Sequence, residues 1–287
     1  MAGNHADKAV LITGCSSGIG ESVATGLKNR GYRVFASARR DADVARLHAE
    51  GHEALKLDLR EAESIEAALE TLLSRTGGTL YALFNNGAYG QPGAVEDLTT
   101  DVLRAQFETN FFGWHELTRR VLPVMRRQGY GRIIQNSSVL GFVALKWRGA
   151  YNSSKFAIEG LTDTLRLELT GSGIHVSIIE PGPIVSRFRE NAYAAFKANI
   201  DTENSPHREA YRRVEARLAS KDGTQPFTLQ GDAVLTKVVH ALESRRPRPR
   251  YYVTVPTYAL GFARRVLSTR CLDMVLRSAS GGEHRRS

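Results

Sequence analysis

The sequence has few cysteines: Cys15 and Cys271 are the only two among 287 residues. A disulfide framework needs several paired cysteines, so the chain is expected in a reducing compartment, the cytoplasm. No run of eighteen apolar residues occurs, which argues against a helix that spans a membrane. Residues 1–8 lack the apolar core of a secretory signal. With 42% hydrophobic residues, the chain is expected to be a globular protein with one large core.

Groups of metal-binding side chains are also missing from the sequence. His48 and His52 have the i,i+4 spacing of one helix face, but Gly51 interrupts that helix and no third ligand follows nearby. A closed metal site needs three or four ligands. No metal site is therefore predicted.

Acidic charge is scarce in the last part of the chain. The segment from Arg245 onward contains ten arginines and two acidic residues, which gives it a net charge of +8. The whole chain carries +9. The nearly neutral body argues against nucleic-acid binding. In the extension, Tyr258, Phe262 and Val266 follow i, i+4, i+8 spacing among arginines, which predicts one apolar helix stripe within 256–277. Two interpretations stay open: contact with an anionic membrane, or packing over the active site or a second subunit.

Strand-like runs, short and apolar or β-branched, alternate with helix-like stretches. The predicted strands are 10–13, 33–37, 54–57, 80–84, 132–135, 175–179 and 250–253. The predicted helices lie near 18–30, 64–74, 100–127, 151–170 and 232–243. This alternation predicts an α/β fold, a Rossmann-type doubly wound parallel sheet of about seven strands, in one catalytic domain of residues 1–255. Within it, 186–230 is predicted to be a helical substrate lid, and 256–287 is a basic amphipathic C-terminal extension.

A glycine-rich turn follows the first predicted strand. Gly14, Gly18 and Gly20 occur directly after the apolar run 9–12 and before a helical pattern. At such a helix N-terminus the exposed N–H groups and the helix dipole attract a pyrophosphate, and glycines let the backbone approach it. The turn therefore predicts a dinucleotide site, although a packed strand–helix corner is the alternative interpretation.

A second motif contains Tyr151 and Lys155, which are four residues apart and so lie on one helix face. A cation beside a phenol favours the phenolate, which lowers the pKa of the tyrosine and lets it exchange a proton near neutral pH. Ser138, thirteen residues before the tyrosine, could bind the same substrate oxygen. Alone, the pair would be an ordinary surface pair, but the glycine turn upstream favours a catalytic interpretation.

The two motifs, in this order, resemble the short-chain dehydrogenase/reductase family over about residues 8–255. Further family landmarks follow in sequence order: Asp58-Leu59, Asn85-Asn86-Gly87-Ala88, Asn110, and Pro181-Gly182-Pro183-Ile184. The residues of the glycine turn and of the segment 179–184 resemble those of the family branch that acts on hydroxysteroids, retinoids and other lipophilic carbonyls. They also resemble those of bacterial NADP-dependent aldehyde reductases.

The resemblance implies a role for each landmark. For catalysis, Ser138 would polarise the carbonyl oxygen, Tyr151 would donate the proton and Lys155 would lower the pKa of the tyrosine and bind the nicotinamide ribose. Asn110 would hold a water beside the lysine, or else be a core asparagine that bends its helix. The residues implied in cofactor binding are Gly14, Ser16, Ser17, Gly18, Ile19, Gly20, Arg39, Asp58, Leu59, Asn86, Tyr151, Lys155, Pro181, Ile184 and Ser186.

Three of these positions need separate comment. Asp58 would accept a hydrogen bond from adenine, or be a turn aspartate that follows a strand. The family usually has Ala-Gly where this chain has Gly87-Ala88, and a positive φ at Ala88 would strain the backbone. Ser186 replaces the common threonine and keeps the hydroxyl that would contact the carboxamide.

The second predicted strand ends without an acidic residue, and Arg39 and Arg40 follow it. An acidic residue there would bind the ribose 2′-hydroxyl of NAD, whereas a guanidinium pairs with the 2′-phosphate of NADP. The sequence therefore favours NADP over NAD, unless both arginines are merely solvated.

Together these features predict an oxidoreductase that transfers a hydride between NADP(H) and a lipophilic aldehyde or ketone, or the matching alcohol. The alternative is a non-catalytic protein of the same fold that senses dinucleotides, but such proteins typically lose the tyrosine or the lysine. The resemblance also implies a homo-oligomer, a dimer or tetramer. The physiological substrate stays open at this point, as does the reaction direction.

Overall fold

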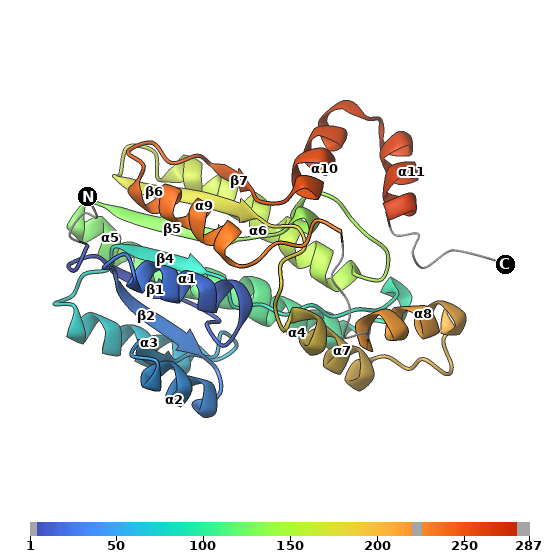
Figure 1. The fold of residues 1–287 in the computed structure, drawn as a ribbon, viewed down its shortest axis with the longest axis horizontal. Coiled ribbons are helices and arrows are strands. Elements are labelled where there is room, and N and C mark those ends of the chain that lie inside the picture. The colour runs from blue at the N-terminus through green and yellow to red at the C-terminus, as the bar shows by residue number, and fades with distance from the viewer. Residues whose placement is uncertain (1–4, 220–225, 280–287) are drawn as a thin grey trace.

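A single parallel sheet forms the centre of the computed structural model, which describes residues 5–219 and 226–279 (Figure 1). The strand order is β3-β2-β1-β4-β5-β6-β7, and all neighbours are parallel. The strands are β1 (Ala9–Ile12), β2 (Arg33–Ala38), β3 (Glu53–Lys56), β4 (Ala82–Asn85), β5 (Gly131–Asn136), β6 (Ile174–Glu180) and β7 (Arg250–Tyr252). The predicted doubly wound sheet is confirmed. Its order reverses between β1 and β4, the point at which such sheets bind ligands.

Helices connect the strands and extend the chain beyond them. They are α1 (Gly18–Lys28), α2 (Asp41–Ala49), α3 (Ala62–Arg75), α4 (Thr100–Phe107), α5 (Gly113–Gln128), α6 (Gly149–Glu168), α7 (Phe188–Asn199), α8 (Arg208–Ala219), α9 (Asp232–Glu243), α10 (Val255–Val266) and α11 (Thr269–Ala279). Three short turns of other helix types are η1 (Val95–Asp97), η2 (Glu108–Phe112, a π-helix) and η3 (Val139–Gly141). The predicted helix at 100–127 is therefore divided by η2. Helix α2 was missed because it has too few large apolar residues for a periodic pattern.

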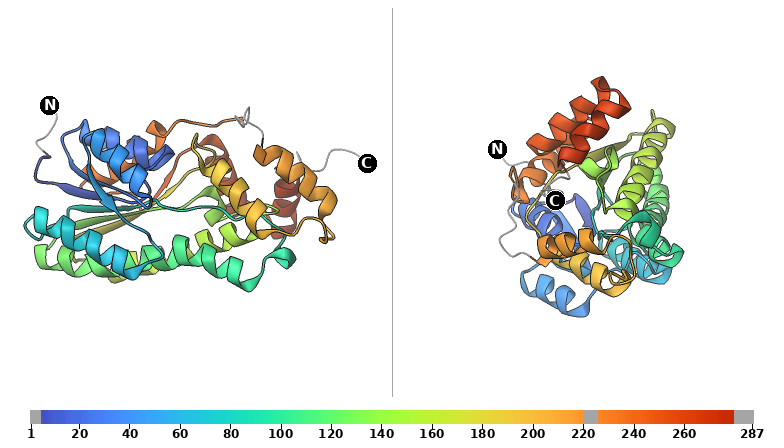
Figure 2. Two further views of the ribbon diagram at one scale, coloured as in Figure 1. Left: turned by 90° about the horizontal axis from the view of Figure 1, so that it is seen from below. Right: turned by 90° about the vertical axis from the view of Figure 1, so that its right-hand side faces the viewer.

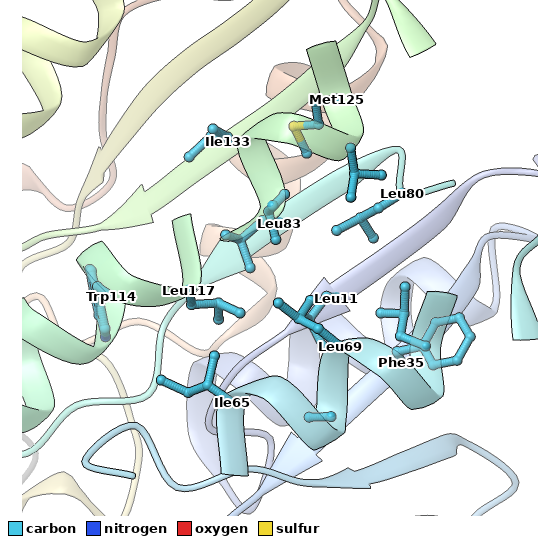
Figure 3. Packing of buried hydrophobic residues seen from close by; sticks show 14 of the residues in the cluster. Leu11, Phe35, Ile65, Leu69, Leu80, Leu83, Trp114, Leu117, Met125 and Ile133 are labelled. Carbon is cyan, nitrogen blue, oxygen red and sulfur yellow. The ribbon is translucent and has the colours of Figure 1, made fainter. Parts of the chain in front are cut away.

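Both faces of the sheet are buried, because successive side chains of a strand point to opposite sides. Leu11 of β1 packs with α3, α5 and α6, as Figure 3 shows for Leu69 of α3 and Leu117 of α5. Val10 and Ile12 of the same strand pack on the other face with α1, α2 and α9. The three-layer arrangement is visible in Figure 2. Since both faces are covered, ligands have access at the ends of the strands.

The predicted lid region contains α7 and α8, which follow the carboxyl end of β6. These helices have a small core of their own, in which Phe196 and Tyr211 are fully buried. The Tyr211 hydroxyl donates to the Asp97 carboxylate and accepts the Ala94 N–H at 2.9 Å. The lid helices are thereby fixed to the segment before α4.

The C-terminal extension forms two helices rather than the single stripe expected across 256–277, because α10 ends at Val266 and α11 starts at Thr269. Leu272 and Leu276 of α11 are buried against Leu140 and Val143. In the described ranges 5–219 and 226–279, no helix is both long and apolar enough to cross a membrane.

Candidate active site

The predicted catalytic side chains meet at the carboxyl end of β5. Ser138 caps η3 directly after that strand, and its Oγ accepts the Leu140 N–H at 3.1 Å. Tyr151 lies in the first turn of α6, and its hydroxyl is close enough to that of Ser138 for the serine to influence its pKa. Lys155 is one turn further along the same helix. Two segments thirteen residues apart in sequence thus place a hydroxyl pair beside an amine.

Lys155 is fully buried, with 1% of its surface exposed. Its Nζ donates to the Asn136 carbonyl at 2.8 Å and lies 4.2 Å from the centre of the Trp114 ring. Burial lowers the pKa of this amine to about 7, although the charge of Glu159 acts in the opposite direction. The amine can therefore gain or lose a proton near neutral pH.

The expected effect of Lys155 on the pKa of Tyr151 stays a prediction, because burial dominates the pKa of the tyrosine in this structure. Burial raises the pKa of Tyr151 to about 12, and only the hydrogen bond with Ser138 opposes that rise. The Lys155 Nζ is 5.6 Å from the centre of the phenol ring, and its own positive charge is weakened by burial. The tyrosine is protonated at neutral pH, which is the form that donates a proton to a carbonyl oxygen.

The buried amine predicts a pH-dependent stability. The unfolded chain keeps the ordinary lysine pKa of 10.5 while the folded value is about 7, so between them the unfolded chain binds more protons. Stability must then rise with pH across that interval, by at most about 1.4 kcal/mol per pH unit, and be lost as pH falls through the folded value. Relative to Lys155→Met, the wild type should gain stability from about pH 7 to about pH 9. Urea unfolding of both proteins checks this, and parallel pH curves would contradict it.

Asn110 is buried within the π-helix η2 and has hydrogen bonds on both sides of its amide. Its Nδ2 donates to the Tyr89 carbonyl at 2.9 Å and to Ser154 Oγ at 3.3 Å, while Oδ1 accepts the Tyr89 N–H at 3.1 Å. Asn110 therefore connects the loop after β4 to α6. A π-turn inside a helix is frequent at functional sites. The water path expected beside Lys155 stays a prediction.

Close contacts explain why the turn between β1 and α1 contains glycines. A Cβ on Gly14 would lie 2.5 Å from Gly87 Cα, one on Gly18 2.4 Å from Ser186 Cβ, and one on Gly20 2.2 Å from the Gly14 carbonyl oxygen. Gly14 and Gly18 also have positive φ values, +72° and +62°. Glycine is required here so that the loop after β4 and the start of the lid segment can approach the N-terminus of α1.

The residues predicted to bind the pyrophosphate surround this helix end. Ser16, Ser17 and Ile19 are partly exposed in the turn, and Ser17 precedes α1 without capping it through its side chain. The first backbone N–H groups of a helix otherwise lack partners and so bind anions. This cradle of glycine backbone and helix N-terminus fits a dinucleotide phosphate.

Asn86 connects the turn to two neighbouring strands. Its Nδ2 donates to the Thr13 carbonyl at 2.9 Å, and its Oδ1 accepts from Asn136 Nδ2 at 2.9 Å. Ala88 does not have the positive φ that would strain the backbone. Among the described residues other than glycine, only Trp147 and Phe227 have a positive φ. The glycine is placed where the backbone of Gly14 approaches most closely.

The two arginines after β2 behave differently. Arg40 donates to the Asp43 carboxylate at 2.7 Å, so its charge is already paired. Arg39 is exposed and, in the part of the chain that the structure describes, has no ion pair. An unpaired guanidinium at this strand end is available to a phosphate.

Asp58 shows the geometry of a turn aspartate. It accepts the Arg60 N–H at 3.0 Å and the Arg60 guanidinium at 2.8 Å. Burial raises the pKa of its carboxyl, but these hydrogen bonds and the charges of Arg60 and Arg39 outweigh burial and lower it. The neighbouring Leu59 side chain borders Gly87. Contact with adenine stays a prediction for both residues.

The remaining predicted positions lie between β6 and α7. The Pro181 carbonyl accepts the Val139 N–H at 2.8 Å, which joins the ends of β5 and β6. Ile184 forms an isolated bridge with Leu229. Ser186 lies against Gly18 and accepts the Phe188 N–H at 3.3 Å. The start of the lid helix is therefore placed beside the glycine turn.

Sequence reasoning missed a buried charge cluster one turn beyond Lys155 on α6. The Arg250 guanidinium pairs with Glu159, with Glu180 at 2.8 Å and with Asp163 at 2.5 Å. Burial raises the pKa of both glutamates, that of Glu180 to about 8. Glu159 and Asp163 continue the four-residue spacing from Lys155, a signal that could have been noticed.

Aromatic and aliphatic side chains surround the catalytic hydroxyls. The Phe188 ring meets the Tyr151 ring edge-on at 5.3 Å, and Val139, Phe142 and Leu145 pack in the same cluster. Phe196 of α7 lies in the core formed with α8 and not in this cluster. The described residues contain no group of three metal-binding side chains. The arrangement can therefore hold an apolar molecule and donate a proton to its oxygen.

Comparison with known proteins agrees with this geometry. The profile of the short chain dehydrogenase family matches residues 8–196. The chain is 40% identical over 276 residues to the uncharacterized oxidoreductase YbbO of Escherichia coli K12, with 96% of each protein covered. It is 32% identical to human retinol dehydrogenase 8, over 84% of this chain and 80% of that protein. A Burkholderia phymatum short chain dehydrogenase/reductase in complex with NAD superposes with a TM-score of 0.77 at 25% identity, with 96% of each chain covered.

Proposed function

We propose, because the chain belongs to the short-chain dehydrogenase/reductase family, that it transfers a hydride between NADP(H) and a lipophilic aldehyde or ketone, or the matching alcohol. The observation that carries the proposal is that Ser138 at the end of β5 and Tyr151 on α6 come together beside the buried Lys155. A nicotinamide cofactor supplies the hydride when it is bound. The decisive experiment follows the nicotinamide absorbance with apolar aldehydes and ketones in the presence of NADPH or NADH.

Ser138, Tyr151 and Lys155 would bind the substrate oxygen and transfer the proton. Ser138 and Tyr151 lie close together, so a carbonyl oxygen placed against both hydroxyls can accept two hydrogen bonds. Because the tyrosine is protonated at neutral pH, it can pass its proton to that oxygen as the alcohol forms. Lys155, with a pKa of about 7, is suited to return a proton to the tyrosine. In the oxidation direction, the same groups remove the proton from the alcohol.

For the cofactor, we propose NADP(H) rather than NAD(H). The support is Arg39, exposed at the end of β2 where an acidic residue would favour NAD. A basic neighbour, Arg187, donates to the Ser16 carbonyl on the same side of the turn, and its charge adds to the attraction of a phosphate.

For the substrate, we propose an apolar carbonyl compound such as a fatty aldehyde, a retinoid or a steroid ketone. The rings around Tyr151 support this class, as does the similarity to human retinol dehydrogenase 8. Burial of one methylene contributes about 0.8 kcal/mol, so kcat/KM for straight-chain aldehydes should rise up to about fourfold with each added methylene until the site is filled. Steady-state kinetics on a series of increasing chain length checks this. A flat series would exclude an apolar site.

We further propose a homo-oligomer in a reducing compartment. Phe112 is half exposed and packs edge-on with Phe111, and Phe107 lies beside them. Exposed aromatic side chains of this kind are enriched where subunits meet.

A further inference from the structure

Helix α10 presents large apolar side chains to solvent. Its outer residues are spaced by three or four positions, so they form one stripe, here named the α10 stripe. The α10 stripe consists of Val255, Tyr258, Phe262 and Val266, which are 61%, 51%, 67% and 58% exposed. Most apolar helix stripes face a core. This one faces outward: each of its side chains is more than half exposed, although the Tyr258 ring also packs edge-on against Tyr252 of β7.

The outward orientation is fixed by the inner face of the helix. Thr257 and Gly261 are buried there, and a Cβ on Gly261 would lie 2.6 Å from the Tyr252 ring of β7. A rotation that buried the α10 stripe would force large side chains into this contact. In Figure 1, α10 and α11 stand out from the sheet beside β7.

A basic cavity adjoins the α10 stripe. It is a depression of about 160 Å³ that opens to solvent and is lined by Lys237, Arg248, Arg250, Tyr251, Tyr252, Tyr258 and Arg265. Tyr258 belongs to both the stripe and the cavity. Arg250 is neutralised by the carboxylates behind it. Lys237, Arg248 and Arg265, by contrast, have no ion pair within residues 5–219 and 226–279, so the cavity carries a net positive charge.

We propose that the α10 stripe and this cavity dock on the surface of an anionic phospholipid bilayer, with a lipid phosphate in the cavity. A bilayer offers both an apolar layer for the stripe and phosphates for the cations. Within the described part of the two helices, Arg264, Arg265, Arg270 and Arg277 face a single acidic residue, Asp273. A second copy of the chain would bring a surface of the same sign against these arginines, so charge complementarity favours the anionic bilayer.

The proposal gives the extension a place in catalysis. Leu272 and Leu276 of α11 pack on Leu140 and Val143, in the same cluster as Tyr151. Docking through α10 would therefore place the catalytic site close to the bilayer, which concentrates lipophilic substrates. This last step rests on the proposed function, whereas docking itself requires no catalysis. A failure to dock is therefore distinguishable from a failure of the proposed reaction.

The test is flotation of the full-length protein with liposomes. Vesicles of phosphatidylglycerol and phosphatidylcholine in equal parts should carry the wild type upward at low salt, while pure phosphatidylcholine vesicles should not. Because the Debye length shrinks from about 30 Å at 0.01 M salt to about 3 Å at 1 M, molar salt should weaken the binding. The paired change Arg248→Gln and Arg265→Gln should weaken partitioning at least about tenfold, since each basic residue contributes about 1 kcal/mol at an anionic surface.

Matched variants separate docking from general surface effects. Phe262→Ser and Leu167→Ser remove equally exposed apolar side chains, each 67% exposed, but Leu167 lies near the end of α6. Only the former should reduce flotation. Likewise Arg126→Gln with Arg127→Gln, exposed on α5, should have little effect. The proposal is wrong if the wild type stays in the soluble fraction on anionic vesicles at low salt. It is also wrong if Phe262→Ser lowers the molar mass of the protein in solution, measured by light scattering, but leaves flotation intact. The stripe would then join two copies of the chain.

Discussion

Replacing Tyr151 with phenylalanine should lower the rate of the chemical step by at least about a hundredfold, the lower part of the range for general acid catalysis. The change removes the hydroxyl that lies near Ser138 and leaves the ring that packs edge-on against Phe188. NADPH binding should persist, because the glycine turn and the N-terminus of α1 are untouched. Single-turnover kinetics, together with a cofactor titration by fluorescence, measures both quantities.

Two further variants, Tyr130→Phe and Ser138→Ala, help to interpret the effect of Tyr151→Phe. Tyr130→Phe removes a hydroxyl from a tyrosine that is 47% exposed, far from the cluster, and should leave the rate unchanged. Ser138→Ala should lower the rate while the protein stays folded, since within residues 5–219 and 226–279 the serine side chain accepts a single hydrogen bond, from the Leu140 N–H. If Tyr151→Phe kept the wild-type rate in the chemical step, another group would have to supply the proton and the proposed mechanism would be wrong.

The sheet was predictable because its signals are local. The central strands are short runs that are buried on both faces, so their apolar residues are continuous in sequence, as in Ala9–Ile12. The glycines at 14, 18 and 20 indicate the turn between β1 and α1, because close contacts there leave no room for a Cβ. The spacing from Tyr151 to Lys155 fixes one helix face by geometry alone. The strand pattern and the Tyr151–Lys155 spacing depend on neighbours in the chain, whereas the glycines record contacts with Gly87 and Ser186, which are distant in sequence.

Electrostatics could not be predicted in the same way. The pKa of Tyr151 depends on how much water reaches it, and the four-residue spacing says nothing about that burial. The cluster around Arg250 joins α6, β6 and β7, which are far apart in sequence. The direction of the α10 stripe was likewise undetermined, because an amphipathic pattern shows which residues share a face but not what the face meets.

Cofactor choice leads to the second large effect, which concerns Arg39. Arg39→Ala should weaken NADPH binding about tenfold or more while changing NADH binding little. A hydrogen bond to a charged group contributes about 1.5–3 kcal/mol, and only NADPH carries the 2′-phosphate. Fluorescence titration of both cofactors gives the ratio of the two dissociation constants, which cancels general effects on the glycine turn.

The neighbouring Arg40 is the matched control, because it carries the same charge one residue further along. Its guanidinium is paired with Asp43 at 2.7 Å, and Asp43 also lies 3.7 Å from Arg187. Arg40→Ala should therefore leave the NADPH to NADH ratio close to that of the wild type, whereas Arg39→Ala should shift it. Equal losses of both cofactors in Arg39→Ala would place the phosphate elsewhere. A larger shift in Arg40→Ala would mean that the 2′-phosphate displaces Asp43 from Arg40, and the roles assigned to the two arginines would have to be exchanged.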